Sequence, residues 1–259
     1  MSCLNIIFST MKLQMKQSFV RPMYRFCLII NPIVNTIFLY EVFLNKRTDS
    51  FIDYVVLGAG LMGIWGCICF SSIGDINRER YSGTLPLIFV APGGFGVIVC
   101  GKVLGNTMMS MLTFVISYLT AGILCGQWMS IQHIGYFGLS MLLTIVCFMV
   151  VSVCFAFVLM LSRKTELYMN LLEIPLVFIC GFTFPVEILP KWMQCISNML
   201  APTWAVRLLR MSVNAVNSDI YIQNLIILVV ELLFMILLTL GLYYWIDKRI
   251  REYATLEVS

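Results

Sequence analysis

Six long apolar segments separated by short polar stretches dominate the pattern of the chain. They cover residues 26–44, 55–73, 103–125, 134–162, 167–185 and 225–246. Each is close to the roughly 20 residues that an α-helix needs to cross the hydrocarbon core of a bilayer. The segment 134–162 is long enough that we expect it to tilt or to extend beyond the lipid. The pattern therefore predicts an all-α polytopic membrane protein with six transmembrane helices.

Residues 1–25 precede the first segment, and their pattern predicts an amphipathic interface helix. Apolar side chains recur every three or four positions between residues 4 and 21, and Lys12 and Lys16 lie on their flank. A basic amphipathic helix beside a span lies in the plane of the membrane surface, on the anionic leaflet. An ordinary cytosolic helix is the alternative, and it is less favoured because no soluble domain follows.

The stretch 74–92 is the one charged, turn-rich interruption between two apolar segments in the first half of the chain. Its charged side chains are Asp75, Arg78, Glu79 and Arg80. They cannot lie in lipid, since a charge at the bilayer centre costs about 2.5–3.5 kcal/mol. Asp75 can cap a short helix, Gly83 can end it at positive φ, and Pro86 prevents its continuation. We therefore expect a short amphipathic helix at the membrane surface between spans two and three.

The segment 186–221 is too polar for a full span, yet apolar residues occur throughout it. Pro185, Pro190 and Pro202 divide it into two short pieces, and its tryptophans suit the headgroup level. A re-entrant pair of amphipathic half-helices before span six fits this pattern, with its open backbone groups facing protein or water. A simple extracellular loop is the alternative.

Composition strengthens the membrane assignment. Hydrophobic residues make up 60% of the 259 positions and charged residues 12%, with a mean hydropathy of +0.93, against about 45–50% and 25% in soluble domains. We expect one transmembrane domain over residues 1–259. The net charge of +4 and the short basic runs give no support for nucleic-acid binding. The ten cysteines form no C-x-x-C pair, which argues against a zinc site or a disulfide framework.

Lysine and arginine positions predict the orientation. With the N-terminus in the cytoplasm, twelve of the 17 basic residues fall on the cytoplasmic side and five on the other. Because positive charges accumulate on the cytoplasmic side, this arrangement places both termini and the stretch 74–92 in the cytoplasm. We expect a multi-pass protein of the cytoplasmic (inner) membrane.

Enzyme signatures are missing from the sequence. Residues 96–102 spell G-x-x-x-x-G-K, but Val103 follows where a nucleotide-binding loop needs Ser or Thr. Gly101 and Gly105 are better explained as a notch for helix packing, with Lys102 extending to the interface. His133 is the only histidine, so no catalytic triad or metal site is expected. We predict no catalytic, cofactor-binding or metal-binding residues in this chain.

Two acids lie inside apolar segments, Glu173 in span five and Glu231 in span six. Intramembrane acids usually face a cavity or a partner. Pro175 removes a helix hydrogen bond near Glu173, so we expect span five to be broken there. We place Glu173 on a translocation path together with Asn31 and Asn35 of span one. A structural hydrogen bond within the bundle is the alternative for Glu173.

Two motifs in register with this topology carry a resemblance to a known family. Residues 79–85 read Glu-Arg-Tyr-Ser-Gly-Thr-Leu, with Pro92 after an apolar run. Residues 181–185 read Gly-Phe-Thr-Phe-Pro, residues 189–192 read Leu-Pro-Lys-Trp, and Pro202 follows. The chain resembles, over essentially its whole length, the permease subunits of type-2 ATP-binding-cassette exporters. Pro86 departs from the pattern, because many relatives carry an acidic residue there.

The resemblance implies a half-transporter. Two permease copies, either identical or related, would enclose the substrate path in the membrane lipid, and a separate soluble ATPase subunit would bind ATP and Mg²⁺. The chain itself would then be a non-catalytic subunit with no cofactor. The stretch 74–92 would be the coupling helix that contacts the ATPase. The coupling residues would be Asp75, Arg78, Glu79, Arg80, Gly83 and Thr84. The residues of the re-entrant region would be Phe184, Pro185, Pro190, Trp192 and Pro202.

Other functions remain open at this stage. A non-transporting immunity or sensor subunit that binds a peptide or lipid is the main alternative. A membrane-embedded enzyme would need clustered catalytic side chains, which the sequence lacks. Within transport, the substrate could be a drug, a peptide, a lipid or a lipid-linked glycan. The absence of a long extracellular segment favours a small amphiphile.

Overall fold

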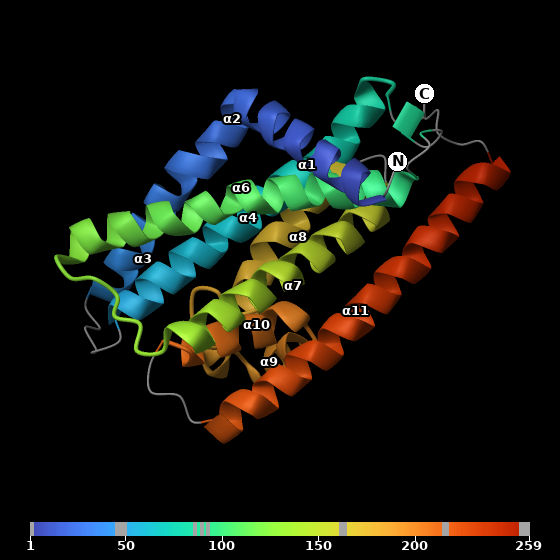
Figure 1. Ribbon diagram of the computed structural model, residues 1–259. Coiled ribbons are helices and arrows are strands. Elements are labelled where there is room, and N and C mark those ends of the chain that lie inside the picture. Colours follow the sequence, from blue (N-terminus) through green and yellow to red (C-terminus); the bar gives the residue numbers. More distant parts are fainter. Residues whose placement is uncertain are drawn as a thin grey trace.

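The computed structural model describes residues 3–44, 51–84, 87–88, 91, 94–160, 165–213 and 218–253, and within these ranges every regular element is helical. The α-helices are α1 (Cys3–Val20), α2 (Pro22–Arg25), α3 (Asn31–Phe43), α4 (Phe51–Tyr81), α6 (Phe95–Cys125), α7 (Ile134–Met160), α8 (Thr165–Ile179), α9 (Lys191–Asn198), α10 (Ala201–Met211) and α11 (Ser218–Tyr253). A π-helical turn, η1 (Phe26–Ile30), joins α2 to α3, and a 3-10 turn, η3 (Val186–Ile188), precedes α9. Figure 1 shows the long helices side by side in one bundle.

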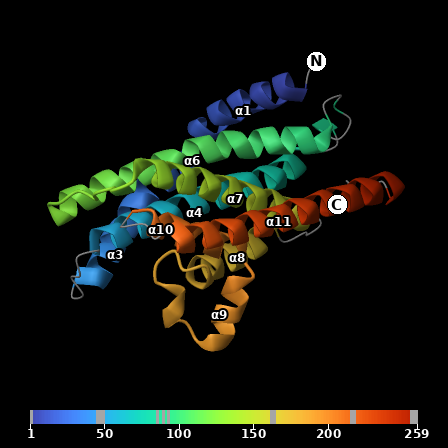
Figure 2. The same cartoon turned by 60° about the horizontal axis from the view of Figure 1, so that its bottom comes forward.

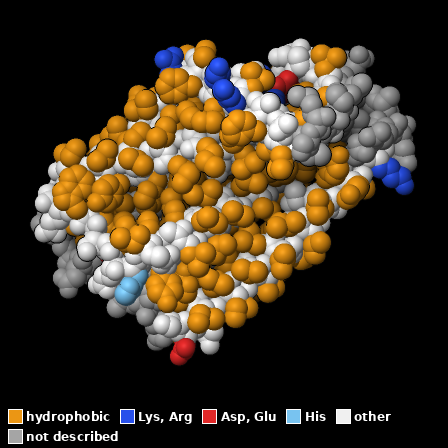
Figure 3. All heavy atoms as spheres, viewed as in Figure 1, with side chains coloured by type: hydrophobic (Ala, Val, Ile, Leu, Met, Phe, Trp, Pro, Cys, Tyr) orange, Lys and Arg blue, Asp and Glu red, His pale blue; other side chains and the backbone are white. Residues whose placement is uncertain are grey.

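Five helical stretches are long and apolar enough to cross a membrane: 22–43, 51–81, 95–125, 134–159 and 218–246. They match five of the six expected spans. The remaining one, α8, has 15 residues, so at 1.5 Å per residue it is about 22 Å long, short of the ~30 Å hydrocarbon core. Apolar side chains cover most of the face seen in Figure 3, and Lys and Arg appear only at its edges. Such a surface suits lipid contact.

The expectation that span five is broken at Pro175 is wrong, because α8 continues through this proline to Ile179. Losing one hydrogen bond does not end an apolar helix when the alternative leaves more backbone groups unsatisfied. The helix ends at Ile179, and Gly181, whose φ is +73°, reverses the chain two residues later. A Cβ at Gly181 would lie 2.7 Å from a methyl group of Val186, so a larger residue would collide with η3.

The helix α4 forms the centre of the bundle. In the most apolar 18-residue stretch of α4, 88% of the residues are buried, whereas the corresponding stretch of α11 is only 11% buried. Helix α4 contacts α3, α6, α7 and α8. Small residues such as Gly63 allow this, because a Cβ at Gly63 would lie 3.0 Å from Thr113 of α6. Trp65 fills the other side, its ring 5.4 Å from Phe148 and 6.2 Å from Phe182.

The helix α1 lies along α6, on the side of the bundle opposite α9 (Figure 2). Its outward face exposes Leu4, Phe8 and Phe19, which suits the predicted interface helix. Its inward face carries two buried polar residues, Gln14 and Ser18. The amphipathic pattern predicted the exposed apolar face of α1, but it did not predict that the opposite face packs against α6.

The expectation that Asp75 begins a separate short helix is wrong. The helix α4 runs without interruption from Phe51 to Tyr81, which places Asp75 in its interior. The predicted stop is confirmed, since Gly83 has a φ of +68° directly after the last turn. Pro86 and Pro92 of the same stretch lie outside the described residues.

The predicted pair of short helices before the last span is confirmed as α9 and α10. Pro190 directly precedes α9, and Pro202 lies in the first turn of α10, where a missing N–H has no helical partner to lose. The two helices differ in burial. Most residues of α10 are buried against α7 and α11, whereas α9 projects from the bundle in Figure 2.

Candidate functional site

A buried polar cluster joins α1, α4 and α6 near the C-terminal end of α4. Its centre is Asp75, which is only 3% exposed. One carboxylate oxygen accepts hydrogen bonds from Arg21 at 2.5 Å and Arg78 at 2.9 Å. The other accepts from Asn106 at 3.1 Å and from Gln14. Four donors thus converge on one carboxylate, so the charge that could not lie in lipid is held inside protein.

A second layer of contacts extends the Asp75 cluster along α1. The side-chain oxygen of Asn106 accepts hydrogen bonds from Gln14 at 3.0 Å and Ser18 at 2.9 Å. Gly101 and Gly105 of α6 form the predicted packing notch, because a Cβ at Gly105 would lie 2.8 Å from the backbone oxygen of Met11. The side chains of α1 can reach Asp75 only because the two backbones approach this closely.

The turn after α4 is held by a second polar group. The carboxylate of Glu79 accepts hydrogen bonds from Lys102 of α6 and from Thr84. The Thr84 backbone N–H also donates to the Glu79 carbonyl oxygen at 3.0 Å, which closes the turn around Gly83. Lys102, which was expected to extend to the interface, forms an ion pair with Glu79. Of the predicted coupling residues, Asp75 and Glu79 therefore serve contacts within the chain, and Arg78 bonds Asp75 from an exposed position.

Exposed apolar side chains flank the same turn. Tyr81 is 80% exposed and Leu87 is 70% exposed. Neither residue was predicted from the sequence to be a contact site, although Tyr81 lies within the motif of residues 79–85. Gln14, Arg21 and Asn106 were likewise not predicted as partners of Asp75. A polar asparagine inside an apolar run was the available signal for Asn106.

The structure brings Glu173 and Asn31 to the same part of α4. A Cβ at Gly66 would lie 2.9 Å from a Glu173 carboxylate oxygen and 3.7 Å from the Asn31 side-chain nitrogen. Glu173 therefore faces the contact between α3, α4 and α8, as its charge requires. Asn35 is half-buried one turn further along α3, and Glu231 is half-buried on α11.

The residues predicted for the re-entrant region divide between packing and exposure. Phe184 stacks on Phe178 with ring centroids 6.2 Å apart, and Pro185 directly precedes η3. Pro202 is buried, whereas Trp192 of α9 is 66% exposed. These positions build and cap the short helices rather than converge on one point.

Within the described ranges, no group of three or more His, Cys, Asp or Glu residues could hold a metal ion. The G-x-x-x-x-G-K segment, residues 96–102, lies wholly inside α6. Its later backbone N–H groups therefore serve the helix, whereas a phosphate-binding loop needs them free to surround a phosphate.

Comparison with known proteins agrees with this picture. The family model for ABC-2 type transporters matches residues 6–214, which include the Asp75 cluster, α8 and the α9–α10 pair. A search of curated proteins gives no match. The family match covers well over half of the chain and accords with its apolar helices. The protein therefore belongs to the ABC-2 type transporter family and is a multi-pass membrane permease component of an ABC transporter.

Proposed function

We propose that the chain is the permease half of an exporter, working as two copies with a separate ATPase subunit in a bacterial-type cytoplasmic membrane. One observation carries this proposal. The Asp75 cluster ties α1 and α6 to the end of α4 that leads directly into the exposed Gly83 turn. A charged, internally braced turn next to exposed apolar residues is a suitable contact for a soluble partner.

The proposed mechanism transmits movement through α4. Closure of two ATPase subunits around ATP would displace the Gly83 turn. Because Glu79 binds both Thr84 and Lys102, the turn and the start of α6 would move together. The helix α4 contacts α3, α6, α7 and α8, so its displacement would repack the bundle and open the path to the outside.

In this proposal the partner contacts differ from those expected from sequence. Tyr81, Leu87 and the exposed side chain of Arg78 would meet the ATPase. Asp75 and Glu79 would hold the shape of the docking surface. Glu173, beside Asn31 and Gly66, would border the substrate path between the two permease copies.

Co-purification tests the proposed partner contact. The tagged chain, expressed with its cognate ATPase subunit, is expected to retain that subunit and to show ATP hydrolysis in the complex. Tyr81→Ala should lower the retained ATPase about tenfold, because one hot-spot aromatic contributes roughly 1–2 kcal/mol or more. Trp192→Ala is the matched control, since Trp192 is 66% exposed on α9, away from this turn.

Two results would contradict the proposal. The first is robust ATP hydrolysis by the isolated, contaminant-free chain. The second is equal retention of the ATPase by wild type, Tyr81→Ala and the Tyr81→Asp, Leu87→Asp double variant. Transport measured with and without ATP in vesicles checks the direction of movement in the same preparation.

A further inference from the structure

A polar cavity lies beside the N-terminal end of α4, away from the Asp75 cluster. Its volume is about 160 Å³, and its wall includes Tyr54, Gly181, Thr203, Arg207 and Arg210. A smaller cavity of about 40 Å³ continues from Tyr54 and Arg210 to Asp53. Since a water molecule needs only about 10–15 Å³ on this measure, the larger cavity has room for a small polar group.

Arg210 is a half-buried cation on the wall of both cavities. Its guanidinium donates a hydrogen bond to the backbone oxygen of Phe182 at 2.8 Å and lies 4.9 Å from the ring centre of Tyr54. Neither partner carries a formal negative charge. Its Nε atom is buried without a hydrogen-bond partner among the described residues. Burial lowers the pKa of Arg210 to about 10, so the side chain is still cationic at neutral pH.

Arg207 places a second cation at the mouth of the cavity. Residues 207 and 210 lie three positions apart on α10, so their side chains leave the same face of the helix. Glu187 is the carboxylate on this wall, 3.5 Å from Arg207, and it is largely exposed. Two arginines and one glutamate give the wall of the larger cavity a net positive charge, and Asp53 lines only the smaller cavity. A cationic side chain with one nitrogen buried and unbonded is costly unless an anion compensates it.

The position of the cavity along α4 indicates which anion it meets. Tyr54 and Asp75 are 21 residues apart on one helix, which at 1.5 Å per residue is about 31 Å. This matches the ~30 Å thickness of the hydrocarbon core. With the Asp75 cluster at one membrane surface, the cavity lies at the headgroup level of the other. Trp204, whose ring is 4.8 Å from the Arg207 guanidinium, is typical of that level.

We propose that the Arg210 cavity binds a phosphate group, supplied by an anionic lipid headgroup or by free phosphate. The planar guanidinium of Arg210 would bond phosphate oxygens, and Arg207 would close over the outer side. This site does not depend on the export function proposed above, because the cavity, its charges and its position along α4 involve no partner subunit.

Thermal unfolding of the purified full-length chain in detergent tests the proposal. Dioleoylphosphatidylglycerol should raise the melting temperature by about 5 °C at saturation, while dioleoylglycerol, which has the same chains and no phosphate, should not. Sodium phosphate is compared with sodium chloride at equal ionic strength. A rise in the lipid arm alone assigns a headgroup site, and a rise with inorganic phosphate assigns a site that also accepts the free anion.

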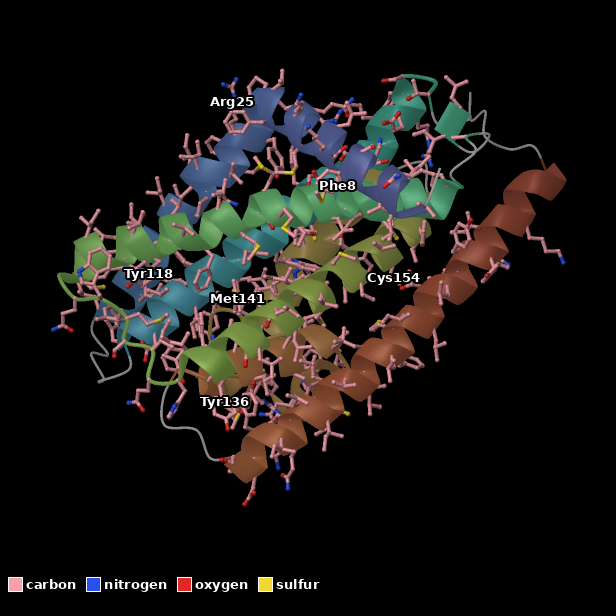
Figure 4. The ribbon with its side chains drawn as sticks, in the orientation of Figure 1. Phe8, Arg25, Tyr118, Tyr136, Met141 and Cys154 are labelled. Atoms are coloured by element: carbon pink, nitrogen blue, oxygen red, sulfur yellow. The ribbon has the colours of Figure 1, made fainter. Side chains whose placement is uncertain are left out.

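Charge variants separate a built site from general attraction. Arg210→Gln should weaken the apparent affinity about 100-fold, and the partly exposed Arg207→Gln about tenfold. Glu187→Gln should strengthen it severalfold, because it removes the negative charge beside Arg207. Arg25→Gln should change nothing, since Arg25 is exposed on α2 and points away from the bundle in Figure 4.

If Arg210→Gln does not fold, Arg207→Gln and Glu187→Gln carry the test with opposite expected signs. The proposal is overturned if neither phosphatidylglycerol nor phosphate stabilises the wild type. It is also overturned if both ligands act equally on wild type, Arg207→Gln and Glu187→Gln.

Discussion

Replacing Asp75 by alanine removes the acceptor on which Gln14, Arg21, Arg78 and Asn106 converge. The two arginines keep some contact with solvent and can rehydrate, whereas the amides of Gln14 and Asn106 stay buried. Breaking a fully buried ion pair costs about 3–5 kcal/mol, and a screened pair nearer 1 kcal/mol. We therefore expect Asp75→Ala to cost about 2–4 kcal/mol.

Thermal unfolding followed by tryptophan fluorescence should show this loss as a fall of about 5–15 °C in the melting temperature. Limited trypsin digestion adds a local readout, because Lys12 and Lys16 are exposed on α1 and should be cut faster once α1 detaches from α6. Glu41→Gln is the control, since Glu41 is exposed on α3. The reasoning fails if Asp75→Ala melts with the wild type and its α1 is digested at the same rate.

Three further predictions concern the α1–α6 contact, the Glu79–Lys102 ion pair and Glu173. Gly105→Val should displace α1 and cost about 1–3 kcal/mol in the unfolding assay, whereas Gly241→Val, where no atom lies within 4 Å of an added Cβ, should be neutral. Glu79→Lys and Lys102→Glu should each lower ATPase-coupled transport, because each breaks the ion pair between these residues. The double variant should recover part of the transport, with a coupling energy of about 1–2 kcal/mol between the two positions. Strictly additive losses would contradict the ion pair. Glu173→Gln should reduce transport at normal expression, because it removes charge but keeps shape. Full transport by Glu173→Leu, normalised to membrane expression, would remove Glu173 from the path.

The sequence predicted the parts of the fold that depend on local pattern. Apolar runs located five long helices, Gly83 marked the end of α4, and Pro190 and Pro202 marked the starts of α9 and α10. Each of these signals acts on its own neighbours in the chain. The length of α8 was overestimated because residues 180–185 are apolar enough to extend a span, while the turn at Gly181 is a backbone property that hydropathy does not register.

The role of Asp75 could not be predicted in the same way. An acid at the edge of an apolar run can cap a helix, reach water or be buried with donors, and the local pattern allows all three. The choice depends on Gln14, 61 positions earlier, and on Asn106, 31 positions later. Both are ordinary polar residues until α1 and α6 approach at Gly105. The same limit applies to Arg210, whose cavity is formed by α4, α10 and the turn after α8.

The residues of the Asp75 cluster are far apart in the sequence, which also sets an order of events during synthesis. Gln14 and Asn106 are 92 positions apart, so the cluster cannot close until the third long helix has been made. At about 5–20 residues per second, α1 waits roughly 5–18 s after its own synthesis. Throughout that time Arg21 and Asp75 can remain hydrated at the membrane surface, and neither charge has to enter lipid alone. Docking of the N-terminal helix therefore reports that α4 and α6 have been inserted side by side.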